Sequence, residues 1–460
     1  MVLVVIRLIF KLVGIVSMSE EWLRMTACDL GRDIEKSIID PLDLTEVYLK
    51  AASKNQFKNR IYARLTEERA LREAEEASTR ARTKSRKGLL DGVPISWKDL
   101  FDTAGIITEA GTGLLKNRVP NKDAWVLKNA TVAGLVCLGK THMSELAFSG
   151  LGQNPMTETP PCVNDHDAVP GGSSSGSAAS VAFNIAAASI GSDTGGSVRI
   201  PAAWNDLVGL KTTIGRLSVS GTVPLCPSFD TVGPLCRSVE DAAYLLGALE
   251  GKKVEKLKTI SLRNVKVMVL ETVALENVRP EVLSGFNQSI NLLKEAGASI
   301  EFREISEITE MMSLTAALFP SEAYATWKTE LEASPELMFP EILERFMLGS
   351  GVLASDYIRG WKRLNEIRFI WLNKTKEFDV VALPTSPILP PNAQRLISDS
   401  DYYKTENLMS LRNTRIGNLL GLAALTLPTY QPSVGLMLMS EPHSEEKLLA
   451  VGSEIERLLS

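Results

Sequence analysis

Two loops rich in glycine and serine flank a short apolar segment between residues 171 and 202. The first reads GGSSSGS, and the second reads GSDTGGS and ends at Ser197. Glycines let backbone N–H groups approach a ligand without obstruction by a Cβ atom, and serines act as nucleophiles, as proton carriers or only as turn formers. The segment is therefore the first candidate for nucleophilic catalysis.

An esterase of the α/β-hydrolase type is one interpretation of the first loop. Gly172, Ser174 and Gly176 satisfy the pattern G-x-S-x-G, and His443 stands late in the chain, where the histidine of such an enzyme falls. That pattern requires a strand leading directly into the serine, whereas CVNDHDAVPGG before Ser174 has the composition of a loop. The context argues against Ser174 as the nucleophile, and the esterase stays an alternative.

Phosphate binding is another interpretation, because glycine-rich turns before helices bind anions. A P-loop places a lysine after its last glycine, but Gly176 is followed by Ser177 and the second loop contains no lysine. Either loop alone is explained by tight packing and turn formation. Two such loops close together, with Lys98 at the end of an expected strand, favour catalysis.

The composition is that of a large globular enzyme. A chain of 460 residues with 45% hydrophobic content buries a sizeable core. The 50 basic and 55 acidic residues leave a net charge of −5, and no basic run indicates direct binding of nucleic acid. The five cysteines are odd in number and include no C-x-x-C pair, so we expect a cytoplasmic protein without disulfides, metal or cofactor.

Residues 1–19 form an apolar extension before the main domain. Arg7 and Lys11 interrupt it, so no stable membrane span is expected, and the order of charges differs from that of a signal peptide. The interpretations are a start assigned too far upstream, with Met18 as the initiator, a helix packed on a membrane surface or on the protein, or export.

Alternating apolar patterns predict an α/β fold with a mixed, largely parallel central sheet covered by helices on both faces. Helices are expected at residues 43–53, 66–83, 124–133 and 280–296, and from 178 to 183. Buried strands are expected at 92–101, 135–139, 185–190, 265–270, 298–302 and 379–383. We expect a single domain over 20–460, with a charged boundary at 250–258 and a helix-rich, substrate-shaping part at about 250–375.

The segment from Gly171 to Ala202 resembles the signature sequence of the amidase signature family, the serine hydrolases of amide bonds. The resemblance runs from Asp43 to the C-terminus, and the chain departs from the family pattern in the loop 156–170. Further matching stretches are GVPISWKDLFDTAG at 92–105, LGKTHMSELAFSGLGQNP at 138–155, GLKTTIGRLS at 209–218, SFDTVGPLCRSVEDAA at 228–243 and LPTSPILPP at 383–391.

The resemblance implies a catalytic triad of two serines and a lysine. Ser197 matches the nucleophile, Ser173 the bridging serine after a cis peptide bond, and Lys98 the base. A lysine serves as a base only when its pKa is lowered, and the apolar surroundings of Trp97 favour this. A carboxylate at Asp99 would oppose it if it pointed inward.

The loop from Thr194 to Ser197 supplies backbone N–H groups for the oxyanion of a tetrahedral intermediate. Thr194, Gly195 and Gly196 are therefore expected to bind substrate, and both glycines are expected to tolerate larger residues badly. Asp193 and Arg199 are expected to brace this loop.

The reaction implied is hydrolysis of a small carboxamide to a carboxylate and ammonia by a freestanding amidase, and the family resemblance implies a homodimer. A glutamine-hydrolysing subunit of a tRNA-dependent amidotransferase is the alternative, but 321–345 lacks the arginine-tyrosine-glycine motif of such subunits. An idle binding module is disfavoured because the triad is intact. Residues 224–229 and 311–357 suggest an apolar acyl pocket.

Overall fold

The structure is a computed structural model that describes residues 20–254 and 256–459. The apolar extension at 1–19, with its three interpretations, lies outside the described residues. None of the helices in the described ranges has the length and hydropathy that a membrane crossing demands.

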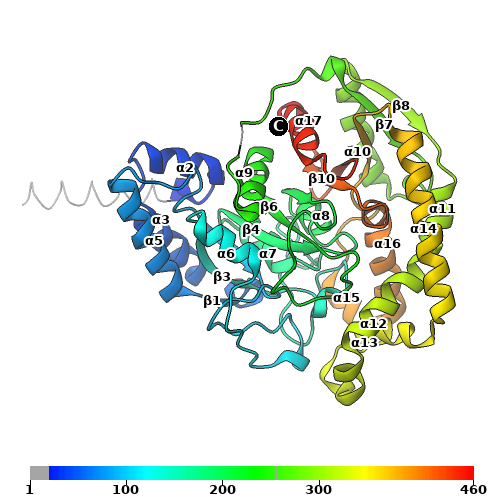
Figure 1. The fold of residues 1–460 in the computed structure, drawn as a ribbon, viewed down its shortest axis with the longest axis horizontal. Helices are drawn as coiled ribbons and strands as arrows, with labels where there is room; N and C mark the ends of the chain where they lie inside the picture. Colours follow the sequence, from blue (N-terminus) through cyan, green and yellow to red (C-terminus); the bar gives the residue numbers. More distant parts are fainter. Residues whose placement is uncertain (1–19, 255, 460) are drawn as a thin grey trace, which may run out of the picture.

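One mixed sheet of eleven strands runs through the described part of the chain (Figure 1). Its order is β1-β3-β2-β4-β6-β5-β10-β11-β9-β7-β8. The strands are β1 (Tyr62–Leu65), β2 (Pro94–Lys98), β3 (Val136–Thr141), β4 (Ala188–Asp193), β5 (Val208–Lys211), β6 (Thr231–Cys236), β7 (Lys266–Leu270), β8 (Ser299–Arg303), β9 (Val380–Pro384), β10 (Ala423–Pro428) and β11 (Gly435–Ser440).

The mixed α/β class is confirmed, but parallel pairing is confined to two groups of three strands, and the edge strand β1 pairs antiparallel with β3. β3, β2 and β4 are parallel at one end, and β9, β7 and β8 at the other. The pairs between them, including β10 with β11, are antiparallel. The six strands predicted from the sequence are those of the two parallel groups, which explains why a largely parallel sheet was expected.

Helices cover both faces of the sheet, and those predicted from the sequence are present with ends that differ by at most three residues. The helices are α2 (Ala27–Glu35), α3 (Pro41–Lys54), α4 (Lys58–Ile61), α5 (Glu67–Arg82), α6 (Trp125–Val132), α7 (Ser175–Ala182), α8 (Arg199–Trp204), α9 (Val239–Glu250), α10 (Pro280–Glu295), α11 (Glu307–Ser313), α12 (Thr315–Ala333), α13 (Pro340–Met347), α14 (Ala354–Thr375), α15 (Ala393–Ser398), α16 (Ser400–Leu419) and α17 (Glu445–Leu459).

The sequence sets the ends of these helices by local capping. The side chain of Asp40 accepts a hydrogen bond from the N–H of Leu42, and Pro41 occupies the first turn of α3, where its missing N–H costs nothing. Gly297 follows α10 with a φ of +95°, a conformation that glycine adopts without strain. These signals are local in the sequence, which is why the helices were predictable.

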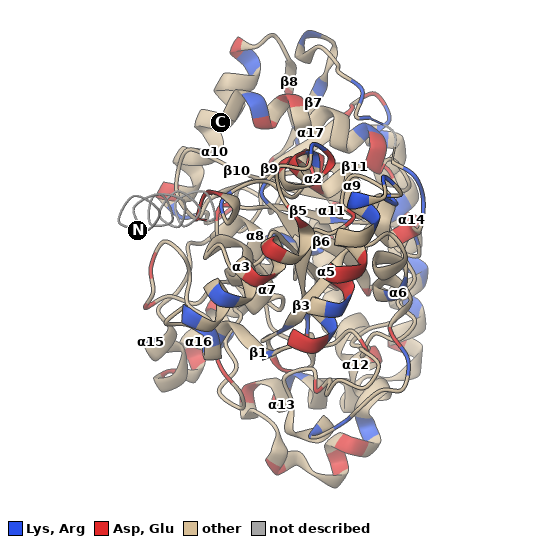
Figure 2. Cartoon of the chain, turned by 90° about the vertical axis from the view of Figure 1, so that its left-hand side faces the viewer, with Lys and Arg blue, Asp and Glu red and all other residues tan. Residues whose placement is uncertain are grey.

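The helices divide into groups at opposite ends of the molecule (Figure 1). α2, α3 and α5 lie at the left of that view, and α12, α13 and α14 lie at the right. One cluster of buried apolar side chains nevertheless extends from Ala27 to Leu459, so the two ends share a core. On the side seen in Figure 2, acidic and basic residues are interspersed along the helices.

Candidate active site

The ends of two parallel strands bring the predicted site residues together. Lys98 is the last residue of β2, and Ser192 and Asp193 end the neighbouring strand β4. Because the carboxyl ends of parallel strands meet at one edge of a sheet, the loop after Asp193 lies beside Lys98. Sites in sheets of this kind form at such edges.

The side chain of Lys98 contacts two serines. Its Nζ atom lies 2.7 Å from Ser173 Oγ and 2.8 Å from Ser192 Oγ, and the lysine has no exposed surface. The peptide bond between Gly172 and Ser173 is cis, as the resemblance implied. Ser173 was predicted from the sequence, whereas Ser192 was missed, although it lies inside the second loop motif.

Burial lowers the pKa of Lys98 from 10.5 to about 7, since desolvation disfavours the charged ammonium. The negative charges of Asp193 and Asp230 raise this pKa and oppose the effect in part. Asp99 turns away, because it pairs with Arg64 at 2.7 Å. About half of the Lys98 side chains are therefore neutral near pH 7, in a form that accepts a proton.

A low pKa alone does not single out Lys98. Lys211 is also buried and its pKa is also lowered to about 7 by desolvation. Its Nζ, however, donates to the backbone carbonyls of Thr212 and Leu422 at 2.9 and 2.7 Å. Contact with a serine hydroxyl beside the second glycine loop is what distinguishes Lys98.

Ser197 lies between β4 and α8, next to the first glycine loop. The N–H of Ser174 donates to the carbonyl of Ser197 at 3.2 Å, so the two loops meet at this point. Within the described residues the Ser197 hydroxyl makes no hydrogen bond, and Ser197 lines a cavity. Its hydroxyl is therefore available to a ligand.

A buried ion pair braces the loop that carries Ser197. Asp193 accepts hydrogen bonds from the N–H groups of Gly196 at 2.8 Å and Val198 at 3.1 Å, and from Arg199 Nε at 3.0 Å. Arg199 also donates to Asn418 Oδ1 at 2.6 Å. Neither Asp193 nor Arg199 is exposed, and the expected bracing by these two residues is confirmed.

The backbone N–H groups of this loop differ in what they bind. The N–H of Gly196 is occupied by Asp193, whereas those of Gly195 and Ser197 have no acceptor in the described chain. The hydroxyl of Thr194 donates to Asp230 at 2.5 Å. The backbone N–H groups of Thr194, Gly195 and Ser197 are thus the ones in this loop without an acceptor in the described chain.

The two glycines of the loop differ in the space around them. A Cβ atom on Gly196 would lie 2.1 Å from Thr414 Oγ1, and its φ of +139° is unfavourable for other residues. A Cβ atom on Gly195 would come no closer than 3.6 Å to its neighbours. A Cβ atom therefore fits at Gly195 but not at Gly196, so the expectation that both glycines tolerate larger residues badly has steric support at Gly196 only.

Two adjoining cavities open in front of Ser197. The inner one, of about 20 Å³, is lined by Ser197, Thr194 and Gly195, and the outer one has about 390 Å³. Both share the walls formed by Phe148, Phe319, Arg345 and Arg415. The expected apolar walls are present, but the two arginines were not predicted from the sequence.

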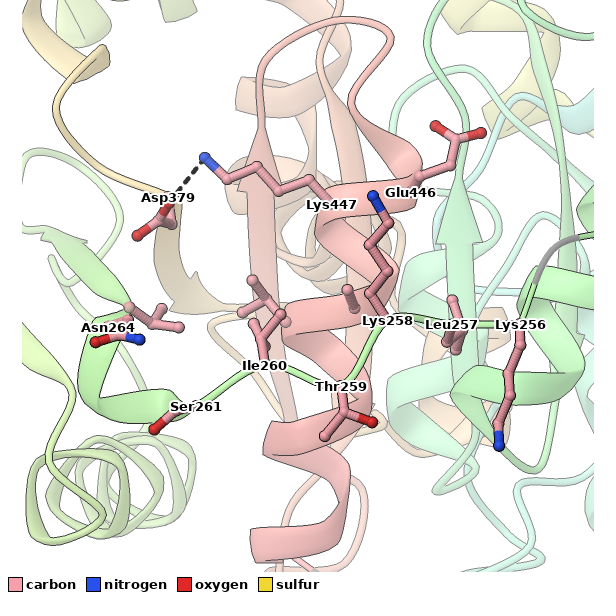
Figure 3. A pocket seen from close by; sticks show the side chains of 13 residues that line it. Lys256, Leu257, Lys258, Thr259, Ile260, Ser261, Asn264, Asp379, Glu446 and Lys447 are labelled. Atoms are coloured by element: carbon pink, nitrogen blue, oxygen red, sulfur yellow. Dashed lines mark ion pairs between the residues drawn. The ribbon is translucent and has the colours of Figure 1, made fainter.

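Another cavity, of about 670 Å³, lies elsewhere in the molecule (Figure 3). It runs between the segment 256–265 and α17, where Lys447 pairs with Asp379 at 2.8 Å. None of the predicted site residues lines it.

The alternative nucleophile Ser174 lies in a different setting. Its hydroxyl donates to the carbonyl of Ser192 at 3.2 Å, and it follows a loop instead of a strand. The N–H of His443 donates to Thr213, and among the described residues no hydrogen bond joins His443 to Ser174. The geometry gives no support to the esterase interpretation.

Comparisons with known proteins agree with the geometry. The model of the family described as Amidase matches residues 43–449. The chain is 33% identical over 387 residues to the 2-amino-5-chloromuconic acid deaminase of Comamonas testosteroni, covering 81% of this chain and 82% of that protein. It is 30% identical over 470 residues to a subunit of the glutamyl-tRNA(Gln) amidotransferase of Acinetobacter baumannii, covering 93% and 94%. It is similar in structure to an amidase crystal structure, with a TM-score of 0.84, 29% identity and coverage of 95% and 100%.

Proposed function

Because the chain belongs to the amidase family, it is a hydrolase of amide C–N bonds, and we propose that it works through an acyl-enzyme on Ser197. In this proposal neutral Lys98 is the base and Ser173 relays the proton between Lys98 and Ser197. The observation that carries the proposal is the 2.7 Å contact of the buried Lys98 Nζ with Ser173 Oγ.

The first half of the reaction forms the acyl-enzyme. Ser197 Oγ attacks the amide carbon while its proton passes to Ser173 and the proton of Ser173 passes to Lys98. The N–H groups of Gly195 and Ser197 hold the resulting oxyanion. The C–N bond then breaks, and the proton returns along the same path to the nitrogen, which leaves as ammonia.

The second half of the reaction restores the enzyme. A water molecule loses a proton to Lys98 through Ser173 and attacks the acyl carbon, and the bond to Ser197 Oγ breaks. Ser197 regains its proton and the carboxylic acid leaves. The balance is one amide and one water converted into one carboxylic acid and one ammonia.

The substrate we propose is a small carboxamide, and the enzyme acts without a partner protein. The outer cavity of about 390 Å³ is of the size that holds a small molecule. The relative from Comamonas testosteroni is named as a deaminase, which supports release of nitrogen from a small acid. The similarity to an amidotransferase subunit keeps glutamine as the alternative substrate.

Ammonia release by the purified chain tests this proposal. Benzamide, indole-3-acetamide, hexanamide and glutamine are compared, with Ser197→Ala as the blank. Release from a neutral amide that is lost in the blank supports a freestanding amidase. Release from glutamine alone points to the amidotransferase, and release that survives in Ser197→Ala contradicts the acyl-enzyme.

A homodimer and a cytoplasmic location stay proposals that rest on the family resemblance and on the odd set of five cysteines without a C-x-x-C pair. Light scattering on the purified chain tests the first. Fractionation of the source cells tests the second.

A further inference from the structure

Two arginines stand in the walls of both cavities in front of Ser197. Arg345 lies on α13, and Arg415 lies on α16. Each lines the inner cavity with Ser197 and the outer cavity as well. A side-chain carbon placed on Gly195 would lie 3.9 Å from Arg415 Nε, so this guanidinium is close to the loop that carries the nucleophile.

Neither guanidinium has a polar partner in the described chain. No hydrogen bond or ion pair joins Arg345 or Arg415 to any described residue, and Arg345 Nη1 is buried without an acceptor. Arg345 and Arg415 as whole residues are partly exposed. Arg199, which is fully buried, shows the ordinary arrangement, because it pairs with Asp193 at 3.0 Å. A buried N–H group without an acceptor, such as those on Nη1 of Arg345, is costly because it loses water and gains no hydrogen bond.

Each of the two guanidiniums lies over the ring of a phenylalanine. Arg345 Cζ lies 4.4 Å from the ring centroid of Phe148, and Arg415 Cζ lies 5.9 Å from that of Phe319. An aromatic ring attracts a cation electrostatically and does not replace the oxygen acceptors that the N–H groups of a guanidinium bind. The rings position the cations without satisfying their hydrogen bonds.

The charges around the two arginines favour an anionic ligand. Burial, together with the positive charge of Arg345, lowers the pKa of Arg415 to about 9. The acidic residues that line the outer cavity are Glu344, which pairs with Lys404 at 2.8 Å, and Glu341. Neither forms an ion pair with the two arginines, so a negative ligand between them would relieve their repulsion.

We infer that Arg345 and Arg415 bind a carboxylate of the substrate, and that the substrate is a short carboxamide bearing this carboxylate. A carboxylate is planar and accepts two parallel N–H bonds from a guanidinium fork. The closeness of Arg415 to Gly195 places the carboxylate a few bonds from the amide carbonyl. The inference rests on the proposed function, because it takes the amide to be held at Ser197.

Paired substrates test this inference by hydrolysis. Succinamate and glutaramate carry the carboxylate, and butyramide and valeramide are their neutral counterparts. In Arg345→Met and in Arg415→Met we expect kcat/KM for the carboxylated amides to fall by about 10- to 100-fold, with the neutral amides changing by less than about threefold. Equal losses on both kinds of substrate, or a wild-type preference for the neutral amides, contradict the inference.

Arg412→Met is the matched control. Arg412 lies on the same helix as Arg415, but its Nη2 faces the carbonyl of Ala274 at 3.5 Å and it lines neither cavity. This variant is expected to keep the wild-type ratio between carboxylated and neutral amides. If Arg412→Met also lowered this ratio, the preference for carboxylated amides would depend on an intact α16 and not on a guanidinium in the cavity.

Calorimetric binding of succinamate to Ser197→Ala separates this inference from the proposed function and does not depend on the folding of an arginine variant. Binding of succinamate but not of butyramide supports the carboxylate site, even if no amide is turned over by the wild type. Absence of selective binding, together with turnover of neutral amides that needs Ser197, overturns the site and leaves the proposed function standing.

Discussion

The pH dependence of activity follows from the burial of Lys98. With a pKa of about 7, roughly half of the Lys98 side chains are neutral at pH 7, against about 1 in 3,000 for a lysine at 10.5. The gain in active base is about 1,500-fold, which corresponds to about 4 kcal/mol. Because the protonated form cannot accept a proton, kcat/KM is expected to fall tenfold per pH unit below about pH 6.5 and to reach a plateau above about pH 8.

Ammonia release from the best amide, measured between pH 5 and 9, tests this prediction. Lys98→Arg keeps the positive charge and the donors but cannot be deprotonated, so kcat/KM is expected to fall by at least about 100-fold at every pH. Lys211→Met removes the other lysine with a pKa of about 7, and kcat/KM of this variant should still fall below about pH 6.5. A flat profile in the wild type or in Lys211→Met, or an active Lys98→Arg, would refute the reasoning.

Three further predictions concern stability. The pKa of Lys98 in the folded protein lies below its ordinary value, so burying this lysine lowers the free energy of unfolding at pH 7, and the loss is relieved only as the pH rises toward 10.5. Lys98→Met should therefore raise the free energy of unfolding, measured by urea titration at pH 7, by about 2 kcal/mol while it abolishes activity. A variant less stable than the wild type would contradict this. Asp193→Asn leaves Arg199 buried without its carboxylate and should cost about 3–5 kcal/mol by the same measurement; a loss below about 1 kcal/mol would count against the bracing role. Gly196→Ala should lower the melting temperature and remove activity, whereas Gly195→Ala should change the free energy of unfolding by less than about 1 kcal/mol. Equal losses of stability in the two variants would contradict the steric difference between the two glycines.

Strands with strong local signals were predictable, and the others were not. The predicted strands β2, β3 and β7 are apolar runs between turns or helices. The missed strands β5 and β6 contain Gly209, Gly233 and Pro234, residues that are unfavourable in strands. Their place in the sheet comes from antiparallel pairing with distant segments, which no local pattern reveals.

The candidate site likewise contains residues that were predictable from the sequence and residues that were not. Ser173 and Ser197 lie in contiguous motifs, and Lys98 ends a strand, so residue types and spacing pointed to them. Arg345 and Arg415 lie on two helices far apart in the sequence, inside otherwise ordinary amphipathic patterns. Only the folded structure shows that both side chains line the same cavities.

The site of the covalent intermediate is the most direct test of the proposed mechanism. The enzyme is quenched with acid during turnover of its best amide, digested with a protease and analysed by mass spectrometry. We expect an acyl group on the peptide that contains Ser197, placed on Ser197 itself by fragmentation and absent in Ser197→Ala. An acyl group on Ser173 or Ser174, or turnover by Ser197→Ala at the wild-type rate, would contradict the mechanism.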